Sequence, residues 1–201
     1  MECIIGKDKF PLIKFENDRY THIFPVTKYQ FERYIWESER APDINYDDML
    51  KTNPRISPEE VSKKKLNPLF ITNITFREAS DFARWMKGRL PVRDEIEVIY
   101  NCLGSIKVSN IFDSIKKSRD MDRRCSVVLS KMLSIFPHGT VKDIIENSKI
   151  EELCSTMSDM PSSIYTYTCN KHRWYYVGKN DTCDSRIEDA VFRVVIDKDN
   201  T

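Results

Sequence analysis

The 201-residue sequence contains few glycines and histidines and no long apolar run, and each shortage excludes something. No apolar segment reaches the roughly 18 residues needed to cross a bilayer. The start, MECIIGKDKF, lacks the basic segment and apolar core of a signal peptide. We therefore expect a cytoplasmic protein without a membrane partner. The 32 lysines and arginines balance 31 aspartates and glutamates, so the overall charge predicts no nucleic-acid partner.

Side chains that bind metals are also sparse. The three histidines, His22, His138 and His172, stand far apart and show no metal-ligand spacing. None of the six cysteines belongs to a Cys-x-x-Cys pair. In a protein without a secretory signal, such cysteines are expected to be free thiols that pack as small apolar side chains. The sequence thus predicts no metal site and no disulfide framework.

Hydrophobic residues make up 40% of the chain, which is enough for a packed core, and we expect residues 1–201 to form a single domain. Two capping-box sequences mark helix starts. Thr27 with Gln30 opens an amphipathic helix through TKYQFERYIWES, and Thr75 with Glu78 opens a second one that runs to about residue 86.

The stretch GRLPVRDEIEVIY, residues 88–100, joins the second of these helices to a third. Gly88 fits the position just past a helix end, where a positive φ is needed. Pro91 fits the first position of the next helix, where its missing N–H costs little. The sequence therefore predicts a helix stop, a tight link and a new helix start.

Strands are predicted where β-branched and aromatic residues alternate or cluster. They are the strand–turn–strand of residues 10–26 with its Asn17-Asp18 turn, LFITNI (69–74), SIYTYTC (163–169), HRWYYVG (172–178) and VFRVVID (191–197). Residues 40–66 read as a loop insertion with one short helix near SPEEVSKKK. Residues 104–140 form a divergent middle of mixed periodicity, partly helical and partly irregular.

Four blocks, in order, resemble the formylglycine-generating enzyme (sulfatase-modifying factor) superfamily: PVTKYQFERYI, NPLFITNITFREASDFARWM, GRLPVRDEIEVIY and the terminal AVFRVV. A fifth segment, VKDIIENSKIEELCS, is weakly similar to the family's Asp-Met-x-Gly-Asn-Val-Trp-Glu-Trp run. The resemblance implies an α+β, C-type-lectin-like fold. Such a fold has two or three helices, twisted antiparallel strands and much loop.

The resemblance also implies a set of structural positions: Gly88, Leu90, Pro91, Glu95, Glu97, Asn147, Phe192 and Arg193. Family members keep carboxylates where Glu95 and Glu97 stand, and these anchor neighbouring loops. We expect both side chains to make buried or half-buried hydrogen bonds.

The departures from the family concern its chemistry. Catalytic members bind copper(I) through two cysteines five positions apart, whereas here Cys169 is followed five positions on by Trp174, and Cys183 is fourteen residues away. The family's calcium-binding segment has Glu146 in place of its glycine, so calcium binding is possible only at a degraded site. The leading hypothesis is a non-catalytic module without a cofactor that binds another protein. The alternative is a copper-dependent oxidase that uses Cys169 and Cys183 on a peptide cysteine.

The candidate binding residues are aromatic and basic groups of the C-terminal part: Tyr165, Tyr167, Lys171, His172, Arg173, Trp174, Tyr175 and Tyr176. Such residues are enriched at binding hot spots, although alternate members of the run could instead face the core of a sheet. The basic run around DRR at 122–124 gives a weaker hypothesis, that the protein binds nucleic acid. The acidic residues within the run disfavour this hypothesis. The family's use of variable loops places ligand specificity in 40–66 and 104–140. The oligomeric state stays open.

Overall fold

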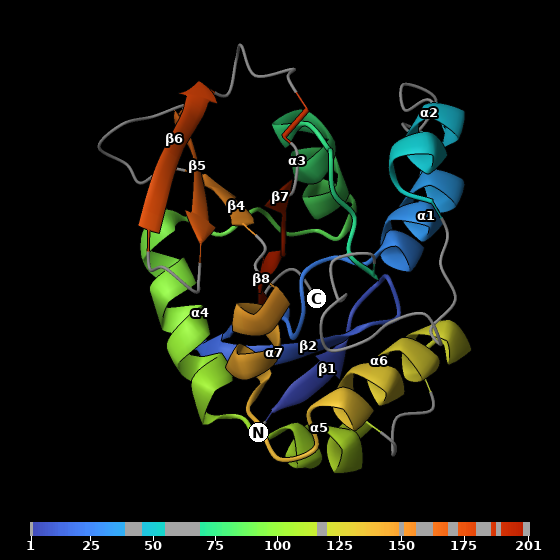
Figure 1. Ribbon diagram of the computed structural model, residues 1–201, viewed down its shortest axis with the longest axis vertical. Coiled ribbons are helices and arrows are strands. Elements are labelled where there is room, and N and C mark those ends of the chain that lie inside the picture. Colours follow the sequence, from blue (N-terminus) through green and yellow to red (C-terminus); the bar gives the residue numbers. More distant parts are fainter. Residues whose placement is uncertain are drawn as a thin grey trace.

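The computed structural model is an α+β protein whose described residues form helices and two four-stranded sheets (Figure 1). It describes residues 2–38, 46–54, 69–115, 120–148, 151–155, 163–168, 173–179, 186–187 and 190–198. The helices are α1 (Lys28–Glu37), α2 (Tyr46–Thr52), α3 (Phe76–Trp85), α4 (Arg93–Ser105), α5 (Val108–Ile115), α6 (Arg123–Ile135) and α7 (Val141–Ser148). The strands are β1 (Cys3–Ile5), β2 (Pro11–Glu16), β3 (Arg19–His22), β4 (Glu151–Ser155), β5 (Ser163–Thr168), β6 (Arg173–Lys179), β7 (Ala190–Val191) and β8 (Val195–Asp197).

The α+β class is confirmed, but the expectation of two or three helices is wrong, because the described residues hold seven. Of the additional helices, α6 has 13 residues, whereas α2, α5 and α7 span only seven or eight residues each. Segments this short do not fill the window in which a helical period becomes visible. Among the described residues, no helix has the length and apolar character needed to cross a membrane.

The first sheet has the order β1-β2-β3-β8, and every neighbouring pair in it is antiparallel. Its central hairpin confirms the strand–turn–strand predicted for residues 10–26. The turn lies at Asn17–Asp18, where Asp18 adopts a φ of 46°. Aspartate tolerates this left-handed conformation better than most residues, which explains its place in the turn.

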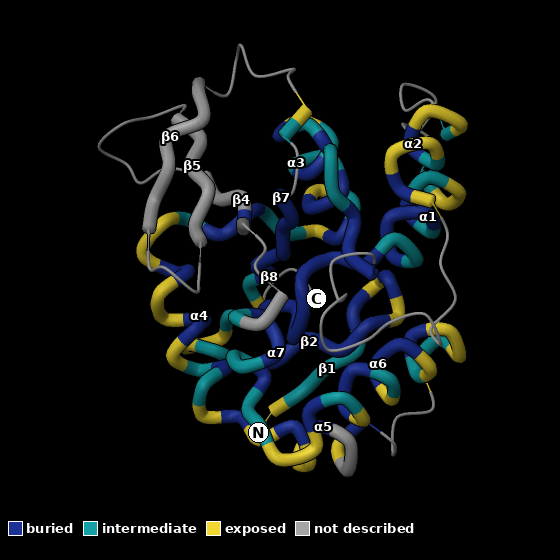
Figure 2. Tube along the Cα trace, in the orientation of Figure 1, coloured by how far each residue is buried: buried dark blue, intermediate teal, exposed yellow. Residues whose placement is uncertain are grey.

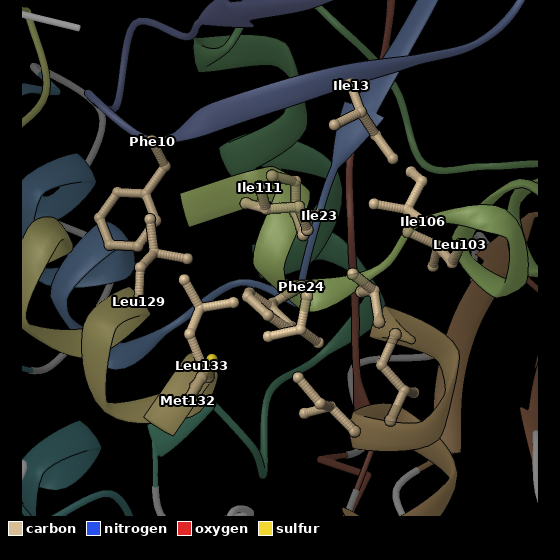
Figure 3. Close-up of a cluster of buried hydrophobic side chains, with 14 of the residues drawn as sticks. Phe10, Ile13, Ile23, Phe24, Leu103, Ile106, Ile111, Leu129, Met132 and Leu133 are labelled. Carbon is tan, nitrogen blue, oxygen red and sulfur yellow. The ribbon is translucent and has the colours of Figure 1, made fainter. Parts of the chain in front are cut away.

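This sheet separates two hydrophobic clusters, because successive side chains of a strand point to opposite faces. In β2, Leu12 belongs to one cluster and Ile13 to the other. In β8, Ile196 and Val195 divide in the same way. The Leu12 cluster includes residues of α1 and α3, whereas the Ile13 cluster includes residues of α4, α5, α6 and α7. Figure 2 shows buried chain at the centre of the molecule and intermediate exposure along β1, and Figure 3 shows residues of the Ile13 cluster.

The second sheet has the order β6-β5-β4-β7, with β7 parallel to β4. VFRVVID, predicted as one strand, is divided between the two sheets. Ala190–Val191 pairs with β4, and Val195–Asp197 pairs with β3. Residues 192–194 carry the chain from one sheet to the other, and all three are fully buried. An unbroken apolar run fits such a crossing as well as it fits one strand, so the sequence pattern cannot distinguish them.

Arg193, in the middle of this crossing, is fully buried and binds both sheets. Its Nε and Nη2 donate to the Glu152 carboxylate of β4 at 2.9 and 2.5 Å. Its Nη1 donates to the main-chain oxygen of His22, at the end of β3, at 2.9 Å. The guanidinium carbon also lies 5.6 Å from the centre of the Tyr100 ring of α4. One side chain thus ties β3, β4 and α4 together.

The two predicted capping boxes are present. Thr27 accepts from the Gln30 N–H at the start of α1, and Thr75 accepts from the Glu78 N–H at the start of α3. In return, the Gln30 and Glu78 side chains accept from the N–H groups of Thr27 and Thr75. Both helices begin one residue after their threonine, as the spacing predicts.

The link after α3 uses Gly88 for a different reason from the one expected. The residue with a positive φ is Lys87, at 61°, and no described glycine has one. The Lys87 N–H donates to the Arg84 oxygen and the Gly88 N–H to the Ala83 oxygen, the two bonds of a Schellman helix end. A Cβ on Gly88 would lie only 2.4 Å from the Val195 oxygen. Glycine is required because the chain passes against β8.

Pro91 is not the first residue of the next helix, although the sequence predicts it there. It lies before the helix, since Val92 is the N-cap of α4 and Arg93 its first residue. Val92 has no side-chain oxygen to cap the helix. Instead, Glu95 reaches back and accepts from the Val92 N–H at 2.9 Å.

Two other expectations need correction. LFITNI forms no strand but only isolated bridges at Phe70 and Ile74, and Asn73 breaks the extended backbone with a φ of 53°. Residues 40–66 are not all loop, because α2 lies among them and Met49 is buried. The helix expected near SPEEVSKKK lies outside the described residues.

We predict that Gly88→Ala destabilises the protein by about 1–3 kcal/mol, the usual cost of overpacking a rigid site. Besides the Val195 oxygen, the new methyl group would meet Val194 Cγ1 at 2.7 Å. Gly104→Ala in α4 is the matched control, because its Cβ would be 3.4 Å from its nearest neighbour. That change should be neutral or stabilising by up to about 1 kcal/mol. Urea unfolding of both variants measures the difference, and equal effects would contradict the prediction.

We predict that Glu152→Gln costs about 3–5 kcal/mol of unfolding free energy, because it leaves the buried Arg193 guanidinium without its counter-charge. Asp81→Asn is the control, since it breaks the Arg84–Asp81 pair, in which the arginine side chain is 62% exposed. It should cost about 1 kcal/mol or less. Chemical denaturation monitored by circular dichroism measures the unfolding free energy of both variants. A similar loss of unfolding free energy in the two variants would contradict the prediction.

Candidate functional site

The turn between β1 and β2 directs a carboxylate into the protein. The Gly6 N–H donates to the Phe10 oxygen at 2.8 Å, and the Lys9 N–H donates to the Gly6 oxygen at 2.9 Å. Lys9 closes the turn with a φ of 65°. Asp8 accepts from the Phe10 N–H at 3.1 Å through Oδ1. An aspartate in a turn is usually exposed, but Asp8 is 1% exposed.

The second oxygen of Asp8 is held by two side chains. Oδ2 lies 2.8 Å from His22 Nε2 of β3 and accepts from Gln30 Nε2 of α1 at 2.6 Å. The Gln30 oxygen at the same time accepts from the Thr27 N–H at 2.7 Å. Gln30 therefore serves both the helix cap and Asp8. A glutamate, the other usual residue of a capping box, would place a second carboxylate against Asp8.

Asp8 lines a cavity of about 250 Å³ between the β1–β2 turn, α1 and the start of α6. Its charged lining residues join these elements. Arg33 Nε of α1 donates to Glu37 Oε1 at 2.7 Å, and Arg33 Nη1 lies 3.4 Å from Asp122 Oδ2. Asp122 is the N-cap of α6 and accepts from the Arg124 N–H at 2.7 Å. The positive end of this helix is thus already occupied by a carboxylate.

Aromatic side chains form other parts of the lining. Trp36 of α1 is 74% exposed, the most exposed large hydrophobic side chain among the described residues. Its ring packs edge-on against Tyr46 of α2, with centroids 5.9 Å apart. The Tyr46 hydroxyl donates to Glu32 Oε1 at 3.3 Å. Tyr46 therefore supports two cavity residues, Trp36 and Glu32, from the segment read as a loop insertion.

A second hollow of about 370 Å³ borders the other side of the α1 end and shares Glu37 with the first. Lys7 and Trp85 line it, and the Lys7 ammonium lies 4.6 Å from the centre of the Trp85 ring. The buried Trp85 Nε1 has no hydrogen-bond partner. Two adjoining hollows on either side of the α1 C-terminus thus make an extended, uneven surface.

Several titratable side chains at and near this surface are buried. The second ring nitrogen of His22, Nδ1, is buried and has no hydrogen-bond partner among the described residues. Burial raises the pKa of the Cys3 thiol to about 11 and also raises the pKa values of Cys102 and Cys125. These three cysteines are therefore protonated near neutral pH. In the part of the chain that the structure describes, no group of three histidines, cysteines or carboxylates could hold a metal.

The predicted C-terminal binding residues that the structure describes lie in β5 and β6. The β5–β6 register places Tyr165 opposite Tyr176 and Tyr167 opposite Trp174. The remaining pairs place Tyr175 opposite Thr166 and Arg173 opposite Thr168. Lys171 and His172 lie outside the described residues, as do the copper candidates Cys169 and Cys183. The patch and the copper site therefore stay predictions.

The structural positions implied by the resemblance have several outcomes. Leu90, Pro91, Phe192 and Arg193 are buried. Phe192 packs edge-on against Phe82 of α3 with centroids 5.3 Å apart. Asn147 lies in α7, so the first part of the segment that resembles the family's calcium-binding run is helical here, whereas Glu151–Ser155 of the same segment forms β4.

Glu95 makes the buried hydrogen bonds expected of it, whereas the expectation for Glu97 is wrong. Glu95 accepts from both Arg89 Nη atoms at 2.6 Å and from Arg19 Nη1 at 3.2 Å. Glu97 is exposed. Two positions along a helix turn a side chain by about 200°, so both glutamates cannot face the same neighbours.

Sequence reasoning missed most of the cavity. Gln30 was recognised only as part of a capping box, and no spacing connects Asp8 with His22 because the contact depends on hairpin pairing. The sequence singles out Asp122 and Arg124 only as part of the DRR run, which weakly indicates nucleic-acid binding and does not predict a cavity. The local signal for the Asp8–His22 contact is an aspartate in a turn followed by a histidine in a strand. This combination is not specific for a functional site.

A scan against protein-family models, a search of the curated proteins and a search of the solved structures each found no match to this chain. Its resemblance to the formylglycine-generating enzyme superfamily therefore stays a prediction, carried by the sequence blocks quoted above.

We predict that Glu95 makes stability depend on acid pH. Burial alone would raise the pKa of Glu95, but hydrogen bonds from Arg89 and the Val92 N–H, and the charges of Arg89 and Arg19, lower it below the usual 4.5. A lowered folded-state pKa gives stability that is present above pH 4.5 and is lost as the pH falls through the folded-state value.

Glu95→Gln should therefore flatten the loss of unfolding free energy below pH 4.5. Glu97→Gln removes the same charge from the exposed face of α4 and should keep the wild-type slope. Urea midpoints from pH 3 to 7 test this. An unchanged slope in Glu95→Gln would contradict it.

Proposed function

We propose that this chain is a cytoplasmic, non-catalytic binding module on a C-type-lectin-like scaffold, and that it recognises another protein at the surface around Trp36. The single observation that carries the proposal is the 74% exposure of Trp36 at a cavity of about 250 Å³ with charged walls. Tryptophan is enriched among the residues that dominate binding energy at protein interfaces. A large exposed side chain held in place by a neighbour loses little freedom on binding.

The surroundings of Trp36 support a protein as the ligand. The two hollows share Glu37 and are lined by residues of α1, α3, α6 and the β1–β2 turn. Drug-sized ligands and cofactors usually occupy pockets of about 300–1,000 Å³ with mostly apolar walls. The Trp36 cavity is smaller, and six of its described lining residues are charged. An uneven, charged surface with one aromatic anchor suits a partner that spreads over both hollows.

The chemistry of the described residues also supports binding over catalysis. Asp8 and His22 hold one another, Arg33 is held by Glu37 and Asp122, and the Cys3 thiol is protonated at neutral pH. These side chains are fixed by their neighbours and are arranged to present a shaped surface.

We predict that peptides selected from a displayed random library on the immobilised protein bind at this surface. Trp36→Ala should weaken the selected peptides by about tenfold or more, as expected for an interface anchor. Val98→Ala, at a 38% exposed position on α4, is the matched control and should leave the affinity unchanged. Failure to enrich any peptide, or equal binding by the wild-type protein and Trp36→Ala, would overturn the proposal.

A further inference from the structure

All charged side chains of α6 are basic. Arg123, Arg124 and Lys131 stand in a helix that contains no aspartate or glutamate. By contrast, α1, α2, α3 and α7 each pair a basic side chain with a carboxylate of the same helix. The residues four positions after the three cations of α6 are valine, valine and isoleucine, so no such pair can form. Within the described part of the chain, Arg123 and Lys131 take part in no ion pair.

Two of these cations stand at the wrong end of the helix for its stability. Arg123 and Arg124 are the first two residues of α6, and its last turn contains no basic residue. The N-terminus of a helix carries partial positive charge, so cations there destabilise it. The N-cap Asp122 offsets only part of this, because its carboxylate is shared between the Arg124 N–H and Arg33. A residue that breaks a local rule of stability is expected where function requires it.

The solvent-facing side of α6 is a basic strip with an apolar centre. The exposed positions, marked yellow along α6 in Figure 2, are Arg123, Arg124, Val127, Ser130 and Ser134. Together with the partly exposed Lys131 we call them the α6 face. Val127 is 45% exposed and stands midway between Arg123 and Lys131. These two cations are eight positions apart, which corresponds to about 12 Å along the helix axis.

The α6 face is continuous with the surface proposed for partner binding. Arg124 lines the same cavity as Trp36, and its side chain is 67% exposed. On the other side of the helix start, the main-chain oxygen of Lys9 accepts from the Asp122 N–H at 3.4 Å. Lys9 is exposed and adds a further cation that pairs with no described carboxylate. A partner anchored on Trp36 that extends along α6 therefore meets several unpaired cations.

We propose that the partner protein carries an acidic segment that docks on the α6 face. The inference rests on the proposed binding function at Trp36 and names the charge of the partner. Arg123 and Lys131 bind carboxylates of the segment, and Val127 contacts an apolar side chain between them. Opposite charges across an interface guide the encounter and select the partner. An exposed valine at the centre favours a protein over a nucleic acid, since contacts to the phosphate backbone are polar.

Two displayed peptide libraries of equal length test the proposal on the full chain. One library omits aspartate and glutamate, and the other omits lysine and arginine. We expect the protein to enrich peptides from the second library and none of comparable affinity from the first. The affinity of the enriched peptides should fall at least about fivefold between about 50 and 300 mM sodium chloride, because salt screens exposed charges.

The double variant Arg123→Gln, Lys131→Gln should weaken the enriched peptides at least about fivefold, since two ion pairs across the interface are lost. It should also reduce their salt dependence. Lys87→Gln with Lys107→Gln is the matched control, because it removes the same charge from two exposed positions outside α6 that also lack a described ion pair. The control should change the affinity less than about twofold. The urea midpoint of Arg123→Gln should not fall, because the change removes a cation from the positive helix end.

Several results would overturn the proposal. They are equal affinities from the two libraries, equal weakening by the two double variants, or weaker binding that coincides with a lower urea midpoint. A DNA duplex of about 20 base pairs is a further probe. Duplex binding at physiological salt that needs Arg123 and Lys131, without any acidic peptide ligand, would reassign the α6 face to nucleic acid and also overturn the proposal.

Failure of this inference can be told apart from failure of the binding function. Peptides that need Trp36 but no acidic residue would leave the binding function standing and remove the acidic partner. Acidic peptides that need Arg123 and Lys131 but not Trp36 would support the α6 face and remove the anchor at Trp36. Enrichment from neither library would overturn both proposals.

Discussion

The fully buried ion pair between Arg193 and Glu152 is the constraint around which the rest of the structure is arranged. A charge taken out of water must be paired and hydrogen-bonded, and Arg193 meets that demand with groups from β3 and β4. The two sheets therefore cannot shift relative to one another without leaving a donor of the guanidinium unsatisfied. Phe192 and Val194 on either side bury apolar surface in the same cluster. Electrostatics fixes the geometry, and the apolar neighbours supply most of the free energy.

The same constraint extends to the candidate binding surface through His22. Its main-chain oxygen accepts from Arg193, while its ring bonds Asp8, which in turn is bonded by Gln30 at the start of α1. A continuous series of buried polar contacts therefore runs from the second sheet to the wall of the cavity. Each of these hydrogen bonds restricts the side chains that it joins, although His22 Nδ1 is buried without a hydrogen-bond partner. A binding surface gains from such rigidity because less freedom is lost when the partner docks.

The sequence predicts a structural feature well where nearby residues determine it, and poorly where residues distant in the sequence do. The Thr27 and Thr75 capping boxes and the Asn17–Asp18 turn are each decided within four residues, and all are present. In α6, the buried positions 125, 128, 129, 132 and 133 carry a helical period that the neighbouring basic run obscured. By contrast, the need for Gly88 comes from Val195, and the site around Asp8 comes from hairpin pairing. Arg193 could be singled out only through the family resemblance.

The position of Arg193 in the chain has a consequence for the order of events during synthesis. Its two main partners lie 171 and 41 residues earlier. The first sheet also lacks its edge strand until residues 195–197 are made. The contacts of Arg193 and the pairing of β8 with β3 therefore form only after residues 193–197 have been made. Contacts this distant in the sequence slow folding and prolong the exposure of apolar surface, so residues 193–197 decide when the two sheets can be joined.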